Sequence, residues 1–421
     1  MEEKLRLDED SKTYFCQIES FNAAKDYFGE GENCLRLIGV EPTDFRFLEI
    51  ADRDVTTFLI DIDINDLISL FLKSYPDPFP MGMILNLLEG KDADEGWGAD
   101  ENEIWLKIEI AVRGANEEEE PLSYMYPTFS EDAPTTICLK HMEMVAPPLM
   151  AFSDALPSFS DEHESKWVGE SYRSSFVFDA FHVGQGMCSL VHNEELGILI
   201  DIGAGTPVTR ASYSAYQHTQ NGMWQTVEKL SYVDAVISHG DSDHWRLLAW
   251  DAKLLAKVGN VIVPKSAKYL AFKDKKIRKK LLRMDSRSLF LPSGDYLHLY
   301  RSQPARWDRN GDCLIALFED IAGDLILAPG DYVYKRFSSD MSLQIQQLSL
   351  LSYRALIVPH HGDEASAKDI PEPKDSGSIA FFSAGTHRTY QHPRKVSVKN
   401  HKKKFKIVKN PECLDIVGVR L

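Results

Sequence analysis

One short stretch of the sequence holds four side chains suited to metal binding within six positions. It reads His239-Gly240-Asp241-Ser242-Asp243-His244 and directly follows a predicted buried strand over residues 233–238. Carboxylate and neutral imidazole groups are ligands for Zn²⁺, Mn²⁺ and Fe²⁺. In an extended loop, positions 239, 241 and 243 share one side, and a turn brings position 244 to the same site. Such a loop can serve two ions about 3.5–4 Å apart, a spacing that suits displacement at a phosphate.

Other residues of the same chemical kind follow apolar, strand-like runs later and earlier in the chain. They are Asp201, Asp331 and the pair His360-His361. Taken alone, Asp331 is typical of a turn, and adjacent histidines also occur in plain loops. The carboxyl ends of strands in a helix-covered sheet meet at one edge, where sites are usually built. The shared position of these residues therefore predicts one common site.

In this order the motifs resemble the metallo-β-lactamase fold. The resemblance is closest to the branch found as the nuclease-like domain of bacterial DNA-uptake (competence) proteins. The matching stretches are residues 181–186 (Phe-His-Val-Gly-Gln-Gly), 199–203, 239–244, 327–331, 358–362 and 390–393 (Tyr-Gln-His-Pro). The resemblance covers about residues 173–415. It implies the α/β class, as a four-layer αβ/βα sandwich with its site at the strand edge between two sheets.

The resemblance also implies one or two divalent metal ions, Zn²⁺ or Mn²⁺, and a role for each candidate residue. His239 and Asp241 resemble the ligands of one ion, and Asp243 and His244 those of the other. Asp331 resembles a bridging carboxylate, and His360 or His361 a late ligand. Asp201 resembles a residue that orients the metal-binding loop, and His392 a histidine near the substrate.

Two departures from the family pattern matter. Asp241 stands where the wider fold has a histidine, which favours Mn²⁺ or Fe²⁺ relative to a three-histidine zinc site. A further family histidine between positions 244 and 331 has only His298 as a candidate, and His298 lies in an apolar run typical of an ordinary core or surface histidine. Asn310 or Asp312 fills that place instead, or else one metal site is weak.

The mechanism that this arrangement supports is hydrolysis by a metal-bound hydroxide. Asp243 would orient the nucleophile and accept its proton, and His392 or His361 would protonate the leaving oxygen. The function expected is that of a phosphodiesterase, as a nuclease acting on DNA or RNA. The alternatives are a hydrolase of a small phosphodiester, a lactone or an ester, and a regulatory binding module with a degenerate metal site.

The elements that position these residues belong to the second of two oppositely charged parts. The whole chain of 421 residues has a net charge of −17, whereas residues 1–170 carry −25 and residues 171–421 carry +8. Turn-forming and acidic residues over 146–172 predict a linker. We therefore expect an acidic α+β accessory domain over 1–145 and the catalytic domain over 173–421.

Basic segments within the second part raise the question of a polyanionic substrate. Residues 253–283 hold 11 Lys and Arg, and residues 394–409 hold eight with no acidic residue. Such runs are typical of nucleic-acid binding, although a solvated helix face gives the same pattern. The acidic first part is expected to meet this basic surface or a protein partner.

Within the first part, apolar runs predict strands at 34–40, 57–62, 104–112 and 136–144, and helices at 20–28 and 65–74. The chain has no apolar stretch of about 18 residues, so we expect no membrane association. The N-terminus lacks a signal-like core, and the six scattered cysteines fit reduced thiols. These features predict a cytoplasmic protein.

Overall fold

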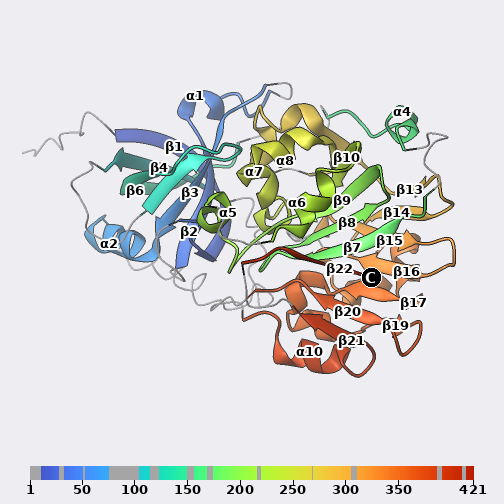
Figure 1. The fold of residues 1–421 in the computed structure, drawn as a ribbon. Helices are drawn as coiled ribbons and strands as arrows, with labels where there is room; N and C mark the ends of the chain where they lie inside the picture. The colour runs from blue at the N-terminus through green and yellow to red at the C-terminus, as the bar shows by residue number, and fades with distance from the viewer. Residues whose placement is uncertain are drawn as a thin grey trace, which may run out of the picture. The chain divides into compact units, whose positions relative to one another are not determined.

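The computed structural model describes residues 11–27, 33–50, 53–74, 104–113, 123–148, 156–167, 174–215, 220–267, 269–304, 311–385, 391–409 and 414–421. The chain forms two compact units (Figure 1). The N-terminal unit comprises Met1–Ala151 together with Leu270–Lys276. The C-terminal unit comprises Phe152–Tyr269 and Ile277–Leu421. A short piece from the middle of the sequence thus belongs to the N-terminal unit.

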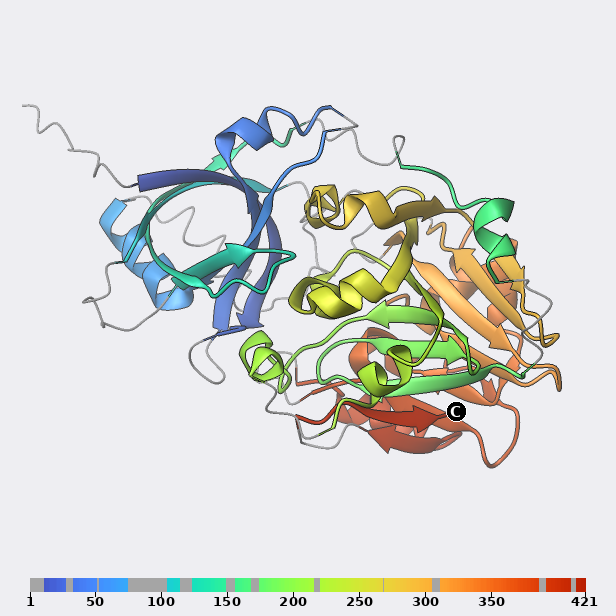
Figure 2. The same cartoon turned by 45° about the horizontal axis from the view of Figure 1, so that its top comes forward.

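The N-terminal unit is built on a closed barrel of six antiparallel strands, which Figure 2 shows as a ring. In barrel order the strands are β1 (Ser11–Ala24), β2 (Asn33–Val40), β3 (Thr57–Asp63), β5 (Ser123–Pro127), β6 (Thr135–Val145) and β4 (Trp105–Val112). Alternate residues such as Tyr14, Cys16 and Ile18 on β1 enter its apolar core. Among the described residues of this unit, the helices α1 (Pro42–Phe45) and α2 (Ile64–Ser74) accompany the strands.

The helix predicted over residues 20–28 is wrong, because β1 continues to Ala24. Ser20 pairs with Arg36, and Ala23 pairs with Cys34, across two irregularities in the register with β2. Long-range strand pairing overrides the local helical pattern here. The four predicted strands and the helix at 65–74 are present in the structure.

Several acidic side chains of the N-terminal unit are buried and paired. Asp61 accepts two hydrogen bonds of 2.7 Å from the Arg36 guanidinium and one of 2.6 Å from the Tyr124 hydroxyl. Asp63 lies 2.6 Å from the Lys25 ammonium group. These carboxylates are therefore not offered to a partner. The acidic runs at 92–103 and 117–120 lie outside the described residues.

The C-terminal unit contains two seven-stranded sheets. The first has the order β12 (Leu281–Met284), β11 (Val258–Pro264), β10 (Tyr232–Val236), β9 (Leu196–Ile202), β8 (Cys188–His192), β7 (Val177–His182) and β22 (Val417–Arg420). The second has the order β13 (Arg287–Phe290), β14 (Tyr296–Arg301), β15 (Leu314–Glu319), β16 (Leu325–Ala328), β18 (Ala355–Ile357), β20 (Ile379–Phe382) and β21 (Lys406–Lys409). A small two-stranded sheet pairs β17 (Ser352–Tyr353) with β19 (Glu372–Pro373).

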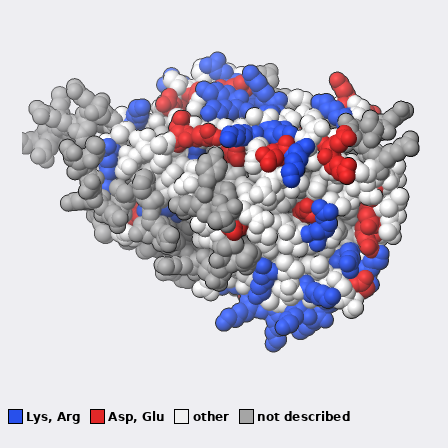
Figure 3. Space-filling model, viewed as in Figure 1, with Lys and Arg blue, Asp and Glu red and all other residues white. Residues whose placement is uncertain are grey.

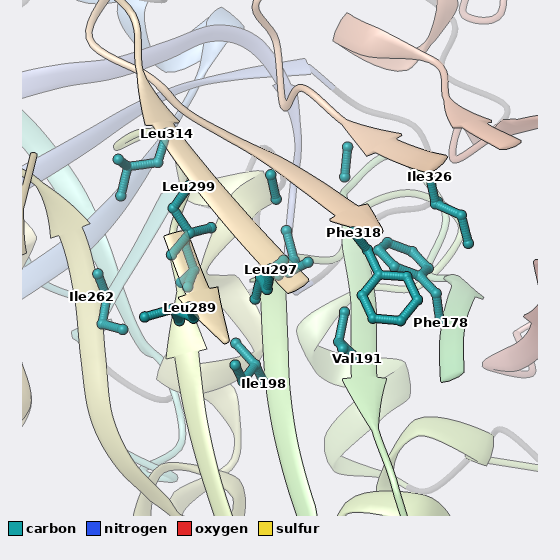
Figure 4. Packing of buried hydrophobic residues seen from close by; sticks show 14 of the residues in the cluster. Phe178, Val191, Ile198, Ile262, Leu289, Leu297, Leu299, Leu314, Phe318 and Ile326 are labelled. Atoms are coloured by element: carbon teal, nitrogen blue, oxygen red, sulfur yellow. The ribbon is translucent and has the colours of Figure 1, made fainter. Parts of the chain in front are cut away.

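The two large sheets pack face to face over one apolar core (Figure 4). Ile198 and Ile262 enter it from the first sheet, and Leu297 enters it from the second. The rings of Phe178 and Phe318 lie 6.2 Å apart between their centroids and join the two layers. Burial on both faces explains why β9 is buried along its whole length.

Helices cover the outer faces of both sheets. Helices α6 (Gly222–Val227), α7 (Arg246–Trp250) and α8 (Ala252–Lys257) contact the strands of the first sheet, and α5 (Arg210–Ser214) packs on α7. On the second sheet, a further apolar cluster joins α9 (Leu343–Leu348), α10 (Lys395–His401) and the 3₁₀ helix η8 (Tyr334–Ser339) to the strands. The result is the predicted four-layer sandwich.

Part of the stretch expected to be a linker is packed. Helix α4 (Asp161–Ser165) is flanked by Phe159 and Trp167, and both aromatic side chains lie in the core between the sheets. The turn-forming composition of this stretch hid these two apolar anchors. The five described cysteines form no disulfide with one another. Among the described residues, no helix has the length and apolar character needed to cross a membrane.

Candidate metal centre

Loops at the ends of three strands bring the candidate ligands together. Residues 239–244 follow β10 of the first sheet. Asp331 follows β16, and the 3₁₀ segment η9 (Pro359–Gly362) with its two histidines follows β18; both strands belong to the second sheet. The site thus combines the carboxyl ends of strands from both sheets, as the order of the motifs predicted.

His239, His244 and Asp331 form a buried cluster of metal-ligating atoms. One ligating atom from each residue lies within 4.8 Å of the other two. Nε2 of His244 is 3.3 Å from Oδ1 of Asp331, and Nε2 of His239 is 3.7 Å from Oδ2 of Asp331. Nε2 of both histidines and Oδ1 of Asp331 are buried without a hydrogen-bond partner among the described residues. Because unsatisfied buried polar atoms are costly, their convergence fits a bound cation.

A second cluster consists of Asp243, His244 and His361, whose ligating atoms also lie within 4.8 Å of one another. Nε2 of His361 is 3.0 Å from Oδ2 of Asp243, and its Nδ1 donates to the carbonyl oxygen of Ser383 at 2.8 Å. The carbonyl contact fixes the ring and directs Nε2 into the site. His244 is common to both clusters.

Asp241 and His360 lie at the margin of these clusters. Oδ2 of Asp241 is 3.4 Å from Nε2 of His239. Nε2 of His360 is 3.8 Å from Oδ2 of Asp331, while its Nδ1 is 3.0 Å from Oδ2 of Asp363. The side chain of His360 is 36 % exposed and that of His361 is 2 % exposed. The geometry therefore puts His361 with the metal-ligating groups and His360 toward solvent, whereas the resemblance left the late ligand open between these two histidines.

Asp201 fixes the metal-binding loop, residues 239–244, through contacts with Ser238 and His244. Its carboxylate accepts hydrogen bonds from the backbone N–H of Ser238 at 2.7 Å and from the Ser238 hydroxyl at 2.9 Å. Oδ2 of Asp201 is also 2.9 Å from Nδ1 of His244. This contact orients the His244 ring so that Nε2 faces Asp331. The orienting role expected for Asp201 has this geometric basis.

The charges at the site are strongly interdependent. Burial disfavours a charged imidazole, yet the carboxylates of Asp201 and Asp331 raise the pKa of His244 well above its usual value. Burial acts against the Asp331 carboxylate, but His244 and His360 lower the pKa of Asp331 well below its usual range. Burial likewise acts against the Asp243 carboxylate, but the hydrogen bond from His361 lowers the pKa of Asp243. A cation would take over the charge compensation that the histidines supply.

The backbone around the site is tightly constrained. His360 and His361 both adopt left-handed conformations, with φ of 47° and 53°. Such residues persist only where the surrounding structure holds them, and they concentrate at functional sites. Gly203 passes so close to the metal-binding loop that a Cβ there would lie 1.5 Å from the carbonyl oxygen of Asp243.

His392 lies beside the two histidines of η9. Its ring centroid is 5.7 Å from that of His360 and 6.3 Å from that of His361. Nδ1 of His392 is 3.3 Å from Nε2 of Gln185, which belongs to the Gly-Gln-Gly motif. Burial and the neighbouring His360 and His361 lower the pKa of His392 to about 3. His392 is thus a neutral group next to the metal-ligating cluster.

The residues considered for the missing middle ligand are not among these clusters. Asp312 is buried and accepts a 2.7 Å hydrogen bond from Nε of Arg301. Asn310 lies outside the described residues. His298 sits on β14, where Nδ1 is 2.7 Å from the Ser288 hydroxyl, in accord with its interpretation as an ordinary histidine.

Sequence reasoning missed three partners of the site: Ser238, Asp363 and Ser383. Ser238 lies between a strand and the metal-binding loop, where a single serine carries no distinctive signal. Asp363 follows the paired histidines by only two positions, so an i,i+3 contact with His360 was open to consideration. Ser383 acts through its backbone carbonyl, for which the sequence carries no signal.

No protein-family model matches the sequence, and no curated protein matches it. The structure is similar to metallo-β-lactamase fold proteins. One is YhfI from Bacillus subtilis, at 10% identity and a TM-score of 0.34 over 58% of this chain and 99% of that chain. A diphosphatase from the PhnP family matches at 15% identity and a TM-score of 0.33 over 56% of this chain and 84% of that chain. A mutant of the β-hydroxylase CmlA matches at 13% identity and a TM-score of 0.38 over 71% of this chain and 69% of that chain.

Proposed function

We propose that the C-terminal unit is a metal-dependent hydrolase that cleaves phosphodiester bonds in DNA or RNA. The observation that carries the proposal is the convergence of three buried atoms without hydrogen-bond partners among the described residues, Nε2 of His239, Nε2 of His244 and Oδ1 of Asp331. With Asp241, Asp243 and His361 nearby, the donors are imidazoles and carboxylates, which suit Zn²⁺ or Mn²⁺. The order of the sequence motifs supports a relation to the nuclease-like branch of competence proteins.

Divalent ions held there would lower the pKa of a bound water molecule and polarise the phosphoryl oxygen. The chain's own groups would do the rest. Asp243 keeps one oxygen, Oδ2, against His361 at 3.0 Å, and its side chain is 25 % exposed. It can therefore orient an attacking water and accept a proton from it.

The leaving oxygen needs a proton donor on the other side of the phosphate. His360 and His392 lie together at the margin of the cluster, with 36 % of the His360 side chain exposed. Burial acts against its charged form, but Asp331 and Asp363 raise the pKa of His360 to about 9. We assign contact with the substrate to these two histidines, and place the expected acid role on His360, which holds a proton, rather than on the neutral His392 or the buried His361.

A basic segment begins directly after His392. The backbone N–H of Arg394 donates to the carbonyl oxygen of Gly362 at 2.8 Å, which ties the start of α10 to the η9 loop. Exposed side chains follow on α10 and the turn after it, at Lys395, Lys399, Lys402 and Lys403. Figure 3 shows Lys and Arg gathered at the lower edge of the view, where α10 lies in Figure 1. A positive surface that starts at the site supports a polyanionic substrate.

The other basic segment, 253–283, is divided between the two units. Residues 270–276 belong to the N-terminal unit, and Lys273 is fully buried there. Lys280 donates to the carbonyl oxygen of Val258 at 2.5 Å. The proposal therefore rests on residues 394–409.

A cleavage assay tests the proposal. Labelled single-stranded DNA, duplex DNA and RNA are incubated with the full chain and Mn²⁺ or Zn²⁺, with and without a chelator. We expect metal-dependent cleavage that falls by about 10²–10⁴-fold in Asp243→Ala, because that variant loses a proton acceptor and a ligand. His298→Ala, which removes a histidine on β14 away from the clusters, serves as the matched control and should retain activity.

The outcome separates the candidate functions. Turnover of bis(p-nitrophenyl) phosphate without cleavage of any nucleic acid would support a hydrolase of small phosphodiesters. Metal binding without turnover of either substrate would support a regulatory module. A chain that binds neither ion would contradict all of these functions.

A further inference from the structure

Residues Leu270–Lys276, which we call the clasp, are held firmly within the N-terminal unit. The clasp carboxylate Oδ2 of Asp274 accepts hydrogen bonds from the backbone N–H of Thr57 at 2.8 Å and from its hydroxyl at 3.0 Å. The ammonium group of Lys273 donates to the carbonyl oxygen of Leu48 at 2.6 Å. Val55 pairs with Asp274 in a parallel bridge.

The apolar part of the clasp is equally well fixed. Leu270, Ala271 and Phe272 are fully buried, and Asp274 is 3 % exposed. The clasp therefore has a defined position in the unit to which it belongs.

Tyr269, the residue immediately before the clasp, packs against the metal-binding loop. A Cβ on Gly240 would be 1.9 Å from both Cδ1 and Cε1 of Tyr269, so the ring rests directly against the Gly240 backbone. The Gly240 backbone is also held by a hydrogen bond, because the indole N–H of Trp245 donates to the carbonyl oxygen of Gly240 at 2.8 Å. Gly240 stands between His239 and Asp241, two of the candidate ligands.

The electrostatic surroundings place Tyr269 near the same ligands. Burial raises the pKa of Tyr269 well above its usual value, and the carboxylates of Asp312 and Asp241 raise it further. The phenol is thus a neutral group beside the loop, able to limit how far Gly240 and Asp241 can move.

We propose that Tyr269 is a positioning residue for the metal-binding loop, and that its ring raises the affinity of the loop for metal ions by holding the Gly240 backbone in place. The inference rests on the proposed function in one respect, that residues 239–244 bind metal.

Titration of the metal-free full chain with Co²⁺, followed by its visible absorption bands, tests the inference without any substrate. We expect Tyr269→Ala to weaken Co²⁺ binding by about 10-fold and to alter the bands, because loss of groups that orient ligands costs about 10–100-fold in metal affinity. Tyr269→Phe, which keeps the ring against Gly240, should bind within about twofold of the wild type.

The matched control for Tyr269→Ala is Ser123→Ala in the barrel of the N-terminal unit. The buried Ser123 hydroxyl makes two hydrogen bonds, accepting one from the backbone N–H of Asp63 and donating one to Asp66. Its loss should lower the melting temperature and leave Co²⁺ affinity unchanged. Unchanged Co²⁺ binding in Tyr269→Ala, or equal effects of Tyr269→Ala and Ser123→Ala on Co²⁺ binding, would overturn the inference alone. A wild type that binds no Co²⁺ would overturn the proposed function and the inference with it.

Discussion

A single carboxylate, that of Asp201, decides which nitrogen of His244 faces the candidate metal centre. It engages Nδ1 of His244 and both hydrogen-bond donors of Ser238. Asp201 itself adopts a left-handed backbone conformation, with φ of 54°. Aspartate tolerates that conformation better than most residues, and the contacts that it makes there compensate for the strain.

Replacement of Asp201 by asparagine should weaken metal binding by about 10–100-fold, because one acceptor oxygen becomes a donor and the His244 ring loses its orientation. Isothermal titration with Zn²⁺ and Mn²⁺ measures the change. Asp340→Asn is the matched control, since Asp340 is a buried carboxylate that accepts hydrogen bonds from Gln303, Ser342 and Tyr332 and belongs to neither metal-ligating cluster. Equal losses in the two variants would show that Asp201 acts on stability alone.

At this scale the sequence was informative where ligands are local. The 239–244 block sits directly after a strand, so its clustering could be predicted from six residues. The choice between His360 and His361 could not, because it depends on two successive left-handed residues and on the carbonyl of Ser383. Ser238 was overlooked because one serine beside a histidine has no distinctive pattern.

Among the elements, α10 shows how a polar residue is used inside a helix that packs on a sheet. His401 is fully buried, with its ring 5.2 Å from that of Phe382 on β20 and 5.9 Å from that of Tyr334. Nδ1 of His401 donates to the carbonyl oxygen of Ser397 at 2.9 Å. Burial lowers the pKa of His401 to about 4.

This depressed pKa predicts a specific loss of stability in mild acid. In the unfolded chain the imidazole of His401 binds a proton with a pKa of about 6.5. The folded state therefore loses stability as the pH falls from about 6.5 toward about 4. Between about pH 7 and about pH 5 the contribution is about 2 kcal/mol. His401→Phe should lose less stability than the wild type over this interval by that amount, as measured by urea unfolding at both pH values. Parallel losses in the two proteins would contradict a neutral, buried His401.

Elements were predictable from the sequence where local pattern and long-range pairing agree. The strands at 34–40 and 57–62 are examples, since both are rich in β-branched and other apolar residues. Residues 20–28 are the opposite case, because pairing with β2 is a non-local property. Phe159 and Trp167 were assigned to a linker because two aromatic residues among turn formers carry little weight in a composition argument.

For the molecule as a whole, the net charge of −17 does not show that some charged side chains are buried in ion pairs whereas others are exposed to solvent. Asp61 and Asp63 neutralise Arg36 and Lys25 inside the N-terminal unit. The lysines at 395, 399, 402 and 403, on and after α10, are exposed instead. Net charge is therefore a poor guide to which surface a polyanion would meet.

Charge reversal on that surface should change how binding responds to salt. In the double variant Lys402→Glu/Lys403→Glu, we expect weaker DNA binding and a slope of log K against log salt reduced by about 2, because two phosphate contacts are lost. Fluorescence anisotropy with a labelled oligonucleotide measures the slope between low and moderate salt. Lys229→Glu, an exposed charge reversal outside both basic segments, should leave it unchanged. If the double variant keeps the wild-type slope, Lys402 and Lys403 do not contact the DNA, and the prediction is contradicted.

The clasp also limits how the chain can be divided into fragments that fold separately. The chain passes between its two units after Ala151, after Tyr269 and after Lys276, so no single break in the sequence separates them. A fragment that starts at the expected domain boundary would carry Leu270, Ala271 and Phe272 without the residues that bury them. Such a fragment would expose an apolar surface and tend to aggregate. The two units are therefore best expressed as one chain. A fusion protein that carries the barrel alone would also need the clasp residues.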